Sequence, residues 1–139
     1  MADLVGTIVK TGSCNKLVQA AETAQILDTL KSPGSFTLFA PTDEAFALLP
    51  EGTLEALLKD IHKLKKVMMY HIAFGDVRSD DLAQIAEAET LEGSIVAIES
   101  VEGRFKVNNA TVLQTDILAD NGVIHIIDAV LMPAMVAGK

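Results

Sequence analysis

The sequence predicts an α+β domain, with helices in its first half and a mostly antiparallel sheet in its second half. Three observations predict this class. The chain's 139 residues suit one hydrophobic core. Apolar residues recur at helical spacing early in the chain, and short runs in which apolar and polar residues alternate, separated by turn pairs, come later. Half of the residues are hydrophobic, and glycine (9) and proline (4) are sparse, which excludes a disordered or fibrous chain. We therefore expect residues 1–139 to form a single domain.

Three helices are predicted before Pro33, where the helical pattern stops. Each has apolar residues on one face, at spacings of three and four, as expected for short helices that cover a core. Their core-facing positions are, in chain order, Leu4, Val5, Ile8 and Val9; then Leu17, Val18 and Ala21; then Ile26, Leu27 and Leu30.

A strand is predicted over "SFTLFA" (35–40), because apolar and polar residues alternate there and aromatic residues are enriched. Pro41 ends it, since proline cannot donate to a ladder. Thr42, followed by two acidic residues, favours a helix N-terminus, and we expect that helix to run to Pro50. Residues 53–70 then carry apolar side chains at helical spacing and predict one or two amphipathic helices.

After Tyr70 the pattern changes. Residues 71–77 are expected to be extended and residues 79–86 to form a short capped helix. From Leu91 onward the sequence predicts strands separated by turn pairs that tolerate a positive φ angle. The predicted strands are 94–100, 104–109, 110–116 and 122–133.

The last predicted strand contains one histidine, His125, in the apolar run "GVIHII" (122–127). Val123, His125 and Ile127 alternate with two isoleucines, so both faces of the strand are apolar and we expect it to be central in the sheet. A histidine in such a strand has little access to substrate. We therefore expect a structural role for it.

Composition and charge exclude several classes of partner. The formal charge of −8 repels polyphosphate backbones, so no nucleic-acid partner is expected. The one basic cluster, "KDIHKLKK" (59–66), is interpreted as a solvated helix face, with an anion patch as the alternative. No apolar run approaches the length of about 18 residues that a bilayer span needs, so no membrane insertion is expected. The N-terminus lacks the pattern of an export signal, so a cytoplasmic location stays open.

No enzyme signature is found: the sequence lacks a Gly-x-Ser-x-Gly elbow, a P-loop, a dinucleotide fingerprint and a His-Glu-x-x-His motif. With Cys14 as the only cysteine, a Cys-based zinc site is excluded. We expect no catalysis, no metal and no cofactor. His71 and His125 are interpreted as buried imidazoles with hydrogen-bond partners, and a metal or catalytic role is the alternative.

Asp116 and Ile117 lie in "LQTDILADNG" (113–122), which we expect to be a polar connection between two strands. A carboxylate beside an aliphatic side chain on a loop suits protein recognition, because the charge fixes orientation and the apolar group contributes buried area. The simpler interpretation is that Asp116 caps a turn and Ile117 fills the end of the sheet. Residue types alone favour the simpler one.

Three segments resemble the landmarks of the fasciclin (FAS1) domain family. They are "GSFTLFAPTDEAFALLP" (34–50), the Tyr70-His71 pair in "VMMYHIAFG" (67–75), and "NGVIHIIDAVLMP" (121–133). Their order and spacing match across essentially the whole chain. The sequence is thus similar to a single-domain, bacterial-type member of this family.

The resemblance implies a β-sandwich or wedge of two small, mostly antiparallel sheets with an N-terminal and central helical layer. It also implies an extracellular, periplasmic or cell-surface module used in adhesion. In animal members, integrin binding is attributed to a Tyr-His segment and to an Asp-Ile pair before the last landmark. Those positions here are Tyr70, His71, Asp116 and Ile117, and Thr115 stands where adhesive members often carry proline.

Our leading hypothesis is a non-catalytic interaction module, monomeric or weakly self-associating, that binds a cell-surface or matrix protein or a polysaccharide through these four residues. The alternative is a small-ligand-binding or hydrolytic protein that uses His71 or His125 in a pocket; it requires a cavity lined by a histidine and an acid. A third hypothesis is a structural protein whose partner is another copy of itself.

Overall fold

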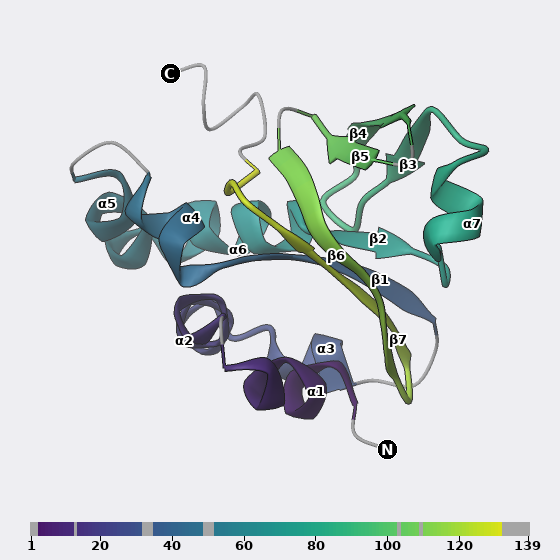
Figure 1. Ribbon diagram of the computed structural model, residues 1–139. Helices are drawn as coiled ribbons and strands as arrows, with labels where there is room; N and C mark the ends of the chain where they lie inside the picture. The colour runs from purple at the N-terminus through teal and green to yellow at the C-terminus, as the bar shows by residue number, and fades with distance from the viewer. Residues whose placement is uncertain are drawn as a thin grey trace.

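Helices α1 (Leu4–Thr11), α2 (Asn15–Thr23) and α3 (Leu27–Lys31) lie together on one side of the sheet (Figure 1). The computed structural model describes residues 3–12, 14–31, 35–48, 52–102, 104–108 and 110–131. Asp3 caps α1 by accepting a hydrogen bond from the Gly6 N–H at 2.8 Å. The cap of α2 comes from a distant residue, because the Asp43 carboxylate accepts the Lys16 N–H at 2.7 Å. All three predicted N-terminal helices are confirmed.

The remaining helices are α4 (Asp43–Ala47), α5 (Thr53–Lys59), α6 (Ile61–Tyr70) and α7 (Ser79–Leu82). Thr42 is the N-cap of α4, as predicted, and its hydroxyl accepts the Ala45 N–H at 3.1 Å. The helix ends at Ala47, earlier than the sequence predicts; Leu49 and Pro50 lie outside the described residues. Asp60 separates α5 from α6 and caps α6, so two helices form there.

The strands form one mixed sheet in the order β2-β1-β7-β6-β5-β4-β3. Their bounds are β1 (Phe36–Pro41), β2 (Ile72–Phe74), β3 (Glu87–Glu89), β4 (Ile95–Val101), β5 (Arg104–Val107), β6 (Ala110–Ala119) and β7 (Gly122–Ile127). Strands β1 and β7 pair in parallel, and every other pairing of these strands is antiparallel. The predicted α+β class is confirmed, while β3 was not predicted.

The sheet folds over on itself. Strand β6, ten residues long, pairs with β5 at its start and with β7 over the rest of its length. At the far ends of the sheet, a single bridge joins Ala73 of β2 to Thr90, the residue after β3. The two sheets of the expected wedge are therefore two halves of one continuous sheet, and β6 belongs to both (Figure 1).

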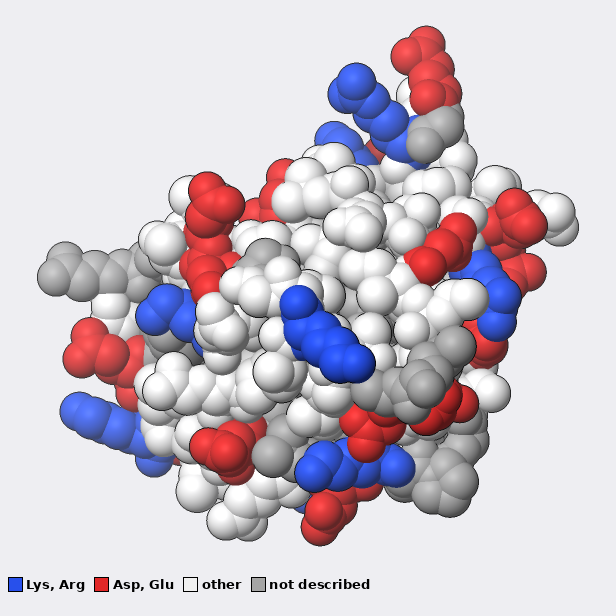
Figure 2. Space-filling view, turned by 60° about the horizontal axis from the view of Figure 1, so that its bottom comes forward, with Lys and Arg blue, Asp and Glu red and all other residues white. Residues whose placement is uncertain are grey.

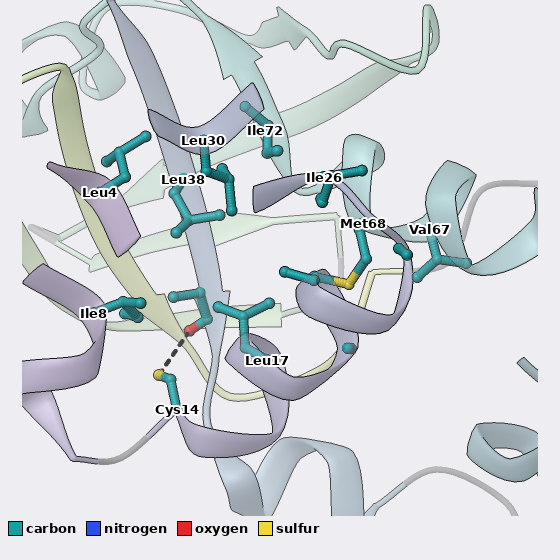
Figure 3. Close-up of a cluster of buried hydrophobic side chains, with 14 of the residues drawn as sticks. Leu4, Ile8, Cys14, Leu17, Ile26, Leu30, Leu38, Val67, Met68 and Ile72 are labelled. Carbon is teal, nitrogen blue, oxygen red and sulfur yellow. Dashed lines mark hydrogen bonds between the residues drawn. The ribbon is translucent and has the colours of Figure 1, made fainter. Parts of the chain in front are cut away.

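Apolar side chains form one core on each side of the central strands. Figure 3 shows the first core, in which side chains of α1, α2 and α6 meet Leu38 of β1, and Cys14 lies with its Sγ 4.0 Å from the Ala40 carbonyl oxygen. The second core, inside the folded sheet, contains Phe39 and Ile127. Because β7 separates the two cores, all six of its residues are buried, which confirms the prediction that this strand is central.

The alternation of apolar and polar residues in β1 does not produce a solvated face. Residues 37–41 are all buried, because β1 lies between β2 and β7. Thr37 is fully buried, and its hydroxyl donates to the Gly75 carbonyl oxygen at 2.7 Å and accepts the Val77 N–H at 2.8 Å. Thr37 is therefore an internal hydrogen-bonding group.

Charged side chains of both signs are dispersed on the face that Figure 2 shows, where the helical layer turns toward the viewer. Such mixing is typical of a solvated surface. Among the described residues, no helix is long and apolar enough to cross a membrane.

Candidate functional site

Asp116 lies within β6, so the expectation that it sits on a loop is wrong. The segment 113–122 was expected to connect two strands, but β6 runs through it to Ala119. Two register shifts against β7 interrupt the ladder on the way, and Asp116 adopts a positive φ of 58°. Bulges of this kind break the two-residue alternation by which a strand is recognised in a sequence.

Ser79 holds the exposed carboxylate of Asp116 in place. The Ser79 N–H donates to Oδ1 at 2.8 Å, and the Ser79 hydroxyl donates to Oδ2 at 2.5 Å. Partial burial acts to raise the pKa of Asp116, but the hydrogen bonds from Ser79 and the nearby Arg78 charge outweigh it, so the pKa lies below its ordinary value. The carboxylate therefore stays ionised near neutral pH and fastens the start of α7 to the sheet.

His125 also links β6 to the segment that precedes α7. Its Nε2–H donates to the Val77 carbonyl oxygen at 2.7 Å, and its Nδ1 accepts the Asp116 N–H at 3.3 Å. This pattern requires the neutral ring, protonated on Nε2. The ring stacks on Phe39 with centroids 5.8 Å apart. Burial lowers the pKa of His125, despite the Val77 hydrogen bond and the Asp116 charge that act to raise it.

Ile117 is half-buried and packs against the first core, on the side of the helical layer. The simpler interpretation of the Asp-Ile pair therefore describes much of its geometry: Asp116 fastens a neighbouring segment, and Ile117 covers the end of a core. The pair still presents one exposed carboxylate beside a partly exposed aliphatic group.

His71 is fully buried at the end of α6. Its Nδ1–H donates to the Val67 carbonyl oxygen at 2.7 Å, and its Nε2 accepts the Leu131 N–H at 2.8 Å. Burial lowers the pKa of His71 to about 4, against the opposing effect of the Val67 hydrogen bond. Both ring nitrogens are thus occupied within the protein.

Tyr70 is also buried, with 6% of its surface exposed. Its hydroxyl accepts a hydrogen bond from the Asn108 side-chain amide at 3.0 Å and donates to the Ile95 carbonyl oxygen at 3.4 Å. The side chain therefore joins α6 to the hairpin of β4 and β5. Tyr70 belongs to the second core while Ile117 covers the first, so the fold does not bring the Tyr-His and Asp-Ile pairs into one cluster.

Sequence reasoning missed Ser79 and Val77 as partners of the Asp116 and His125 side chains. The sequence signal for Ser79 was only that of a capped helix, because its partner lies 37 residues away in the chain. No local spacing reveals such a pairing.

Two surface depressions among the described residues have volumes of about 470 Å³ and 440 Å³ and lie on the outer surface of β4, β5 and β6. Neither imidazole lines either of them. Within the described part of the chain, no group of three or more His, Cys, Asp or Glu is placed to hold a metal ion. The geometry required by the hydrolytic alternative, an accessible histidine beside an acid in a cavity, is not found at His71 or His125.

Comparison with known proteins agrees with this architecture. The sequence profile of the Fasciclin domain matches residues 12–133. The chain belongs to the fasciclin domain family. Its fasciclin relatives include the uncharacterized protein sll1735 of Synechocystis sp., 44% identical over 132 residues, which cover 95% of this chain and 98% of that protein.

Another relative is human periostin, which is 43% identical over 115 residues. The match covers 82% of this chain but only 14% of periostin. Among solved structures, the FAS1 domain pair of the insect cell adhesion molecule Fasciclin I superposes with a TM-score of 0.79 at 19% identity, covering 97% of this chain and 52% of that one. This superposition confirms the predicted FAS1 fold.

Proposed function

We propose that this fasciclin domain is a non-catalytic interaction module that binds a cell-surface or matrix protein or a polysaccharide outside the cell. The FAS1 domain pair that shares this fold comes from an insect cell adhesion molecule, which supports this assignment. Its partner-contact surface is centred on Asp116 and Ile117. The observation that carries the proposal is the fixed, exposed carboxylate of Asp116.

A carboxylate has about four lone-pair sites, and Ser79 uses two of those of Asp116. Because Asp116 is exposed, its remaining sites could accept hydrogen bonds from a basic group or contact a bound cation on a partner. Because Ser79 already fixes the side chain of Asp116 and His125 holds its backbone N–H, binding would cost little conformational entropy. Ile117 would add apolar contact beside the charge.

For Tyr70 and His71 we propose an indirect part in partner binding. Both are buried, so neither offers side-chain surface to a partner. Their hydrogen bonds fix α6 against the β4–β5 hairpin and against Leu131. Tyr70 and His71 would therefore stabilise the part of the fold that positions the partner-contact surface.

Adhesion of cultured animal cells and of polysaccharide-coated beads to the immobilised domain tests this proposal. Asp116→Asn combined with Ile117→Ala should reduce retention to background on the surface that binds. Asp120→Asn, which removes an exposed acid from the same hairpin, should leave retention unchanged. Equal retention by the wild type and the double variant would remove the pair from the mechanism.

The variant Ser79→Ala distinguishes direct contact of Asp116 with a partner from the structural role of Asp116 in fastening α7. It removes one hydrogen bond to Asp116 but keeps the carboxylate. If Asp116 contacts the partner, Ser79→Ala should weaken retention less than Asp116→Asn does. The reverse order would show that Asp116 acts only by fastening α7.

A further inference from the structure

Strands β5 and β6 separate soon after the turn that joins them. They pair only at Lys106–Thr111 and Val107–Ala110, although β6 continues to Ala119. Beyond Thr111, β6 pairs with β7 on one side. In the described part of the chain, no strand pairs with its other side from Val112 to Thr115.

A surface depression of about 440 Å³ lies where the two strands separate. We call it the β5–β6 notch; it is lined by Arg104, Phe105 and residues 111–115. Leu113 is 57% exposed within it, and Phe105 is half-buried against the second core. An open strand edge beside exposed apolar side chains is a template for pairing with another extended chain.

Among the described residues, Arg104 is the only charged one that lines the notch. Its cross-strand neighbour on β4 is Val101, whereas Lys106 lies opposite Glu99. Glu102 shares the adjoining depression with Arg104, but no ion pair joins Arg104 to another described residue. A partner carboxylate could therefore approach Arg104 without displacing an existing ion pair.

We propose that the β5–β6 notch binds an extended, acidic segment of a partner protein by strand addition to β6. Main-chain hydrogen bonds along 112–115 would supply affinity, while Leu113 and Phe105 would receive apolar side chains and Arg104 a carboxylate. A peptide fits better than a polysaccharide, because an open strand edge presents donors and acceptors at peptide spacing. A second copy of the chain is the competing occupant, and the test below distinguishes it from a partner peptide.

This inference rests on the proposed function and specifies the chemistry of its partner. The test uses the purified domain and a short fluorescent peptide of alternating valine and threonine with glutamate at both ends. Binding is measured by anisotropy and mapped by amide chemical shifts. We expect shifts confined to Arg104, Phe105 and residues 111–115. An N-methylated peptide, whose backbone cannot pair, should not bind, and a glutamine-for-glutamate peptide should bind about twofold to fivefold more weakly.

Two protein variants sharpen the test. Arg104→Gln should weaken binding about twofold to fivefold, and Leu113→Asp at least about tenfold, because it places a charge on the edge that pairs. The matched controls are Lys31→Gln and Val9→Asp, which change an exposed cation and a 53% exposed apolar residue on the helical layer. Both controls should bind the peptide as the wild type does.

Shifts that map elsewhere, or equal binding of the N-methylated peptide, would overturn the proposal. So would concentration-dependent shifts at 112–115 without peptide together with a doubled mass in sedimentation, since a second copy would then be the occupant. The peptide assay involves no cell or bead, so the two proposals can fail separately. The notch can bind no peptide while adhesion through Asp116 persists, or adhesion can fail while the notch still binds peptide.

Discussion

The backbone N–H of Leu131 donates to Nε2 of His71 across 60 positions of the chain, at a distance of 2.8 Å. This bond requires an unprotonated Nε2, and the second ring nitrogen is held by Val67 at 2.7 Å. Protonating His71 would therefore break the link between α6 and the segment that follows β7. A fold held in this way should respond to mild acid.

The pKa of His71 is about 4 in the folded protein, compared with 6.5 for an ordinary histidine. Between these values the unfolded chain binds a proton that the folded protein does not bind. The free energy of unfolding should thus be greatest above pH 6.5 and fall as the pH drops toward 4, with His71 contributing about 3 kcal/mol of the loss. Urea unfolding at intervals from pH 7.5 to 4 measures this dependence.

His71→Gln should flatten much of the pH dependence, and the smaller remainder should reflect His125, whose pKa is also lowered by burial. His62→Gln, which changes an exposed histidine on α6, should keep the full dependence. A wild-type unfolding free energy that does not change between pH 7 and 4.5 would contradict the role given to His71.

Gly122 begins β7 at a point where β1 passes very close. A Cβ at this position would lie 2.0 Å from the Phe36 carbonyl oxygen and 2.9 Å from its carbonyl carbon. Because the backbone of a central strand cannot move aside without disturbing the parallel ladder, Gly122→Ala should lower the free energy of unfolding by about 3 kcal/mol. Gly93→Ala, with a φ of 105° but no atom within 4 Å of the added Cβ, should cost about 1 kcal/mol. Equal urea midpoints for the two variants would argue against the close approach.

Asn121 links the β6–β7 turn to the helical layer. Its Oδ1 accepts the Leu4 N–H at 2.9 Å, and its Nδ2 donates to the Leu30 carbonyl oxygen at 2.6 Å. Asn121→Ala leaves both buried groups unpaired and should lower the free energy of unfolding by about 3 kcal/mol. Asp120→Ala, at the exposed neighbouring position, should change it by less than about 0.5 kcal/mol. If the lost hydrogen bond causes the destabilisation, hydrogen exchange at the Leu4 amide should be faster in the Asn121 variant and unchanged in the Asp120 variant.

Thr37 provides a test with a closely matched control. Thr37→Val keeps the side-chain shape but leaves the Val77 N–H and the Gly75 carbonyl without the hydroxyl, at a cost of about 2 kcal/mol. Thr37→Ser keeps the hydroxyl and loses one methyl group, at a cost of about 1 kcal/mol. Hydrogen exchange at the Val77 amide should accelerate only in the valine variant. Similar exchange in both variants would show that the hydroxyl does not hold this segment.

Local sequence patterns predicted much of the fold, because helix caps and buried strands depend mainly on residues close together in the chain. The Thr42 cap needs only the residues that follow it, and the burial of β7 can be read from its unbroken apolar run. Strand β3 was missed because Glu-Ala-Glu, at the edge of the sheet, lacks an apolar face. The last three residues of β6, 117–119, were missed because the bulges around Asp116 break the alternation.

The candidate site was less predictable, because its geometry depends on pairings between distant segments. Nothing near Asp116 in the sequence indicates that Ser79 will bind its carboxylate. Likewise, the family resemblance marks Tyr70 and His71 as adhesive positions, but their burial depends on how α6 meets the folded sheet. Sequence periodicity specifies which faces are apolar, while the partner of each polar side chain follows from the tertiary fold.

The parallel pairing of β1 with β7 also sets the order in which the protein can fold. Strand β1 leaves the ribosome early, but the strand that completes its ladder comes near the end of the described chain. Contacts between such distant segments make folding slow, and an unpaired central strand is prone to aggregate while it waits. The nascent chain must therefore keep β1 sheltered, by its early helices or by a chaperone, until β7 has been synthesised.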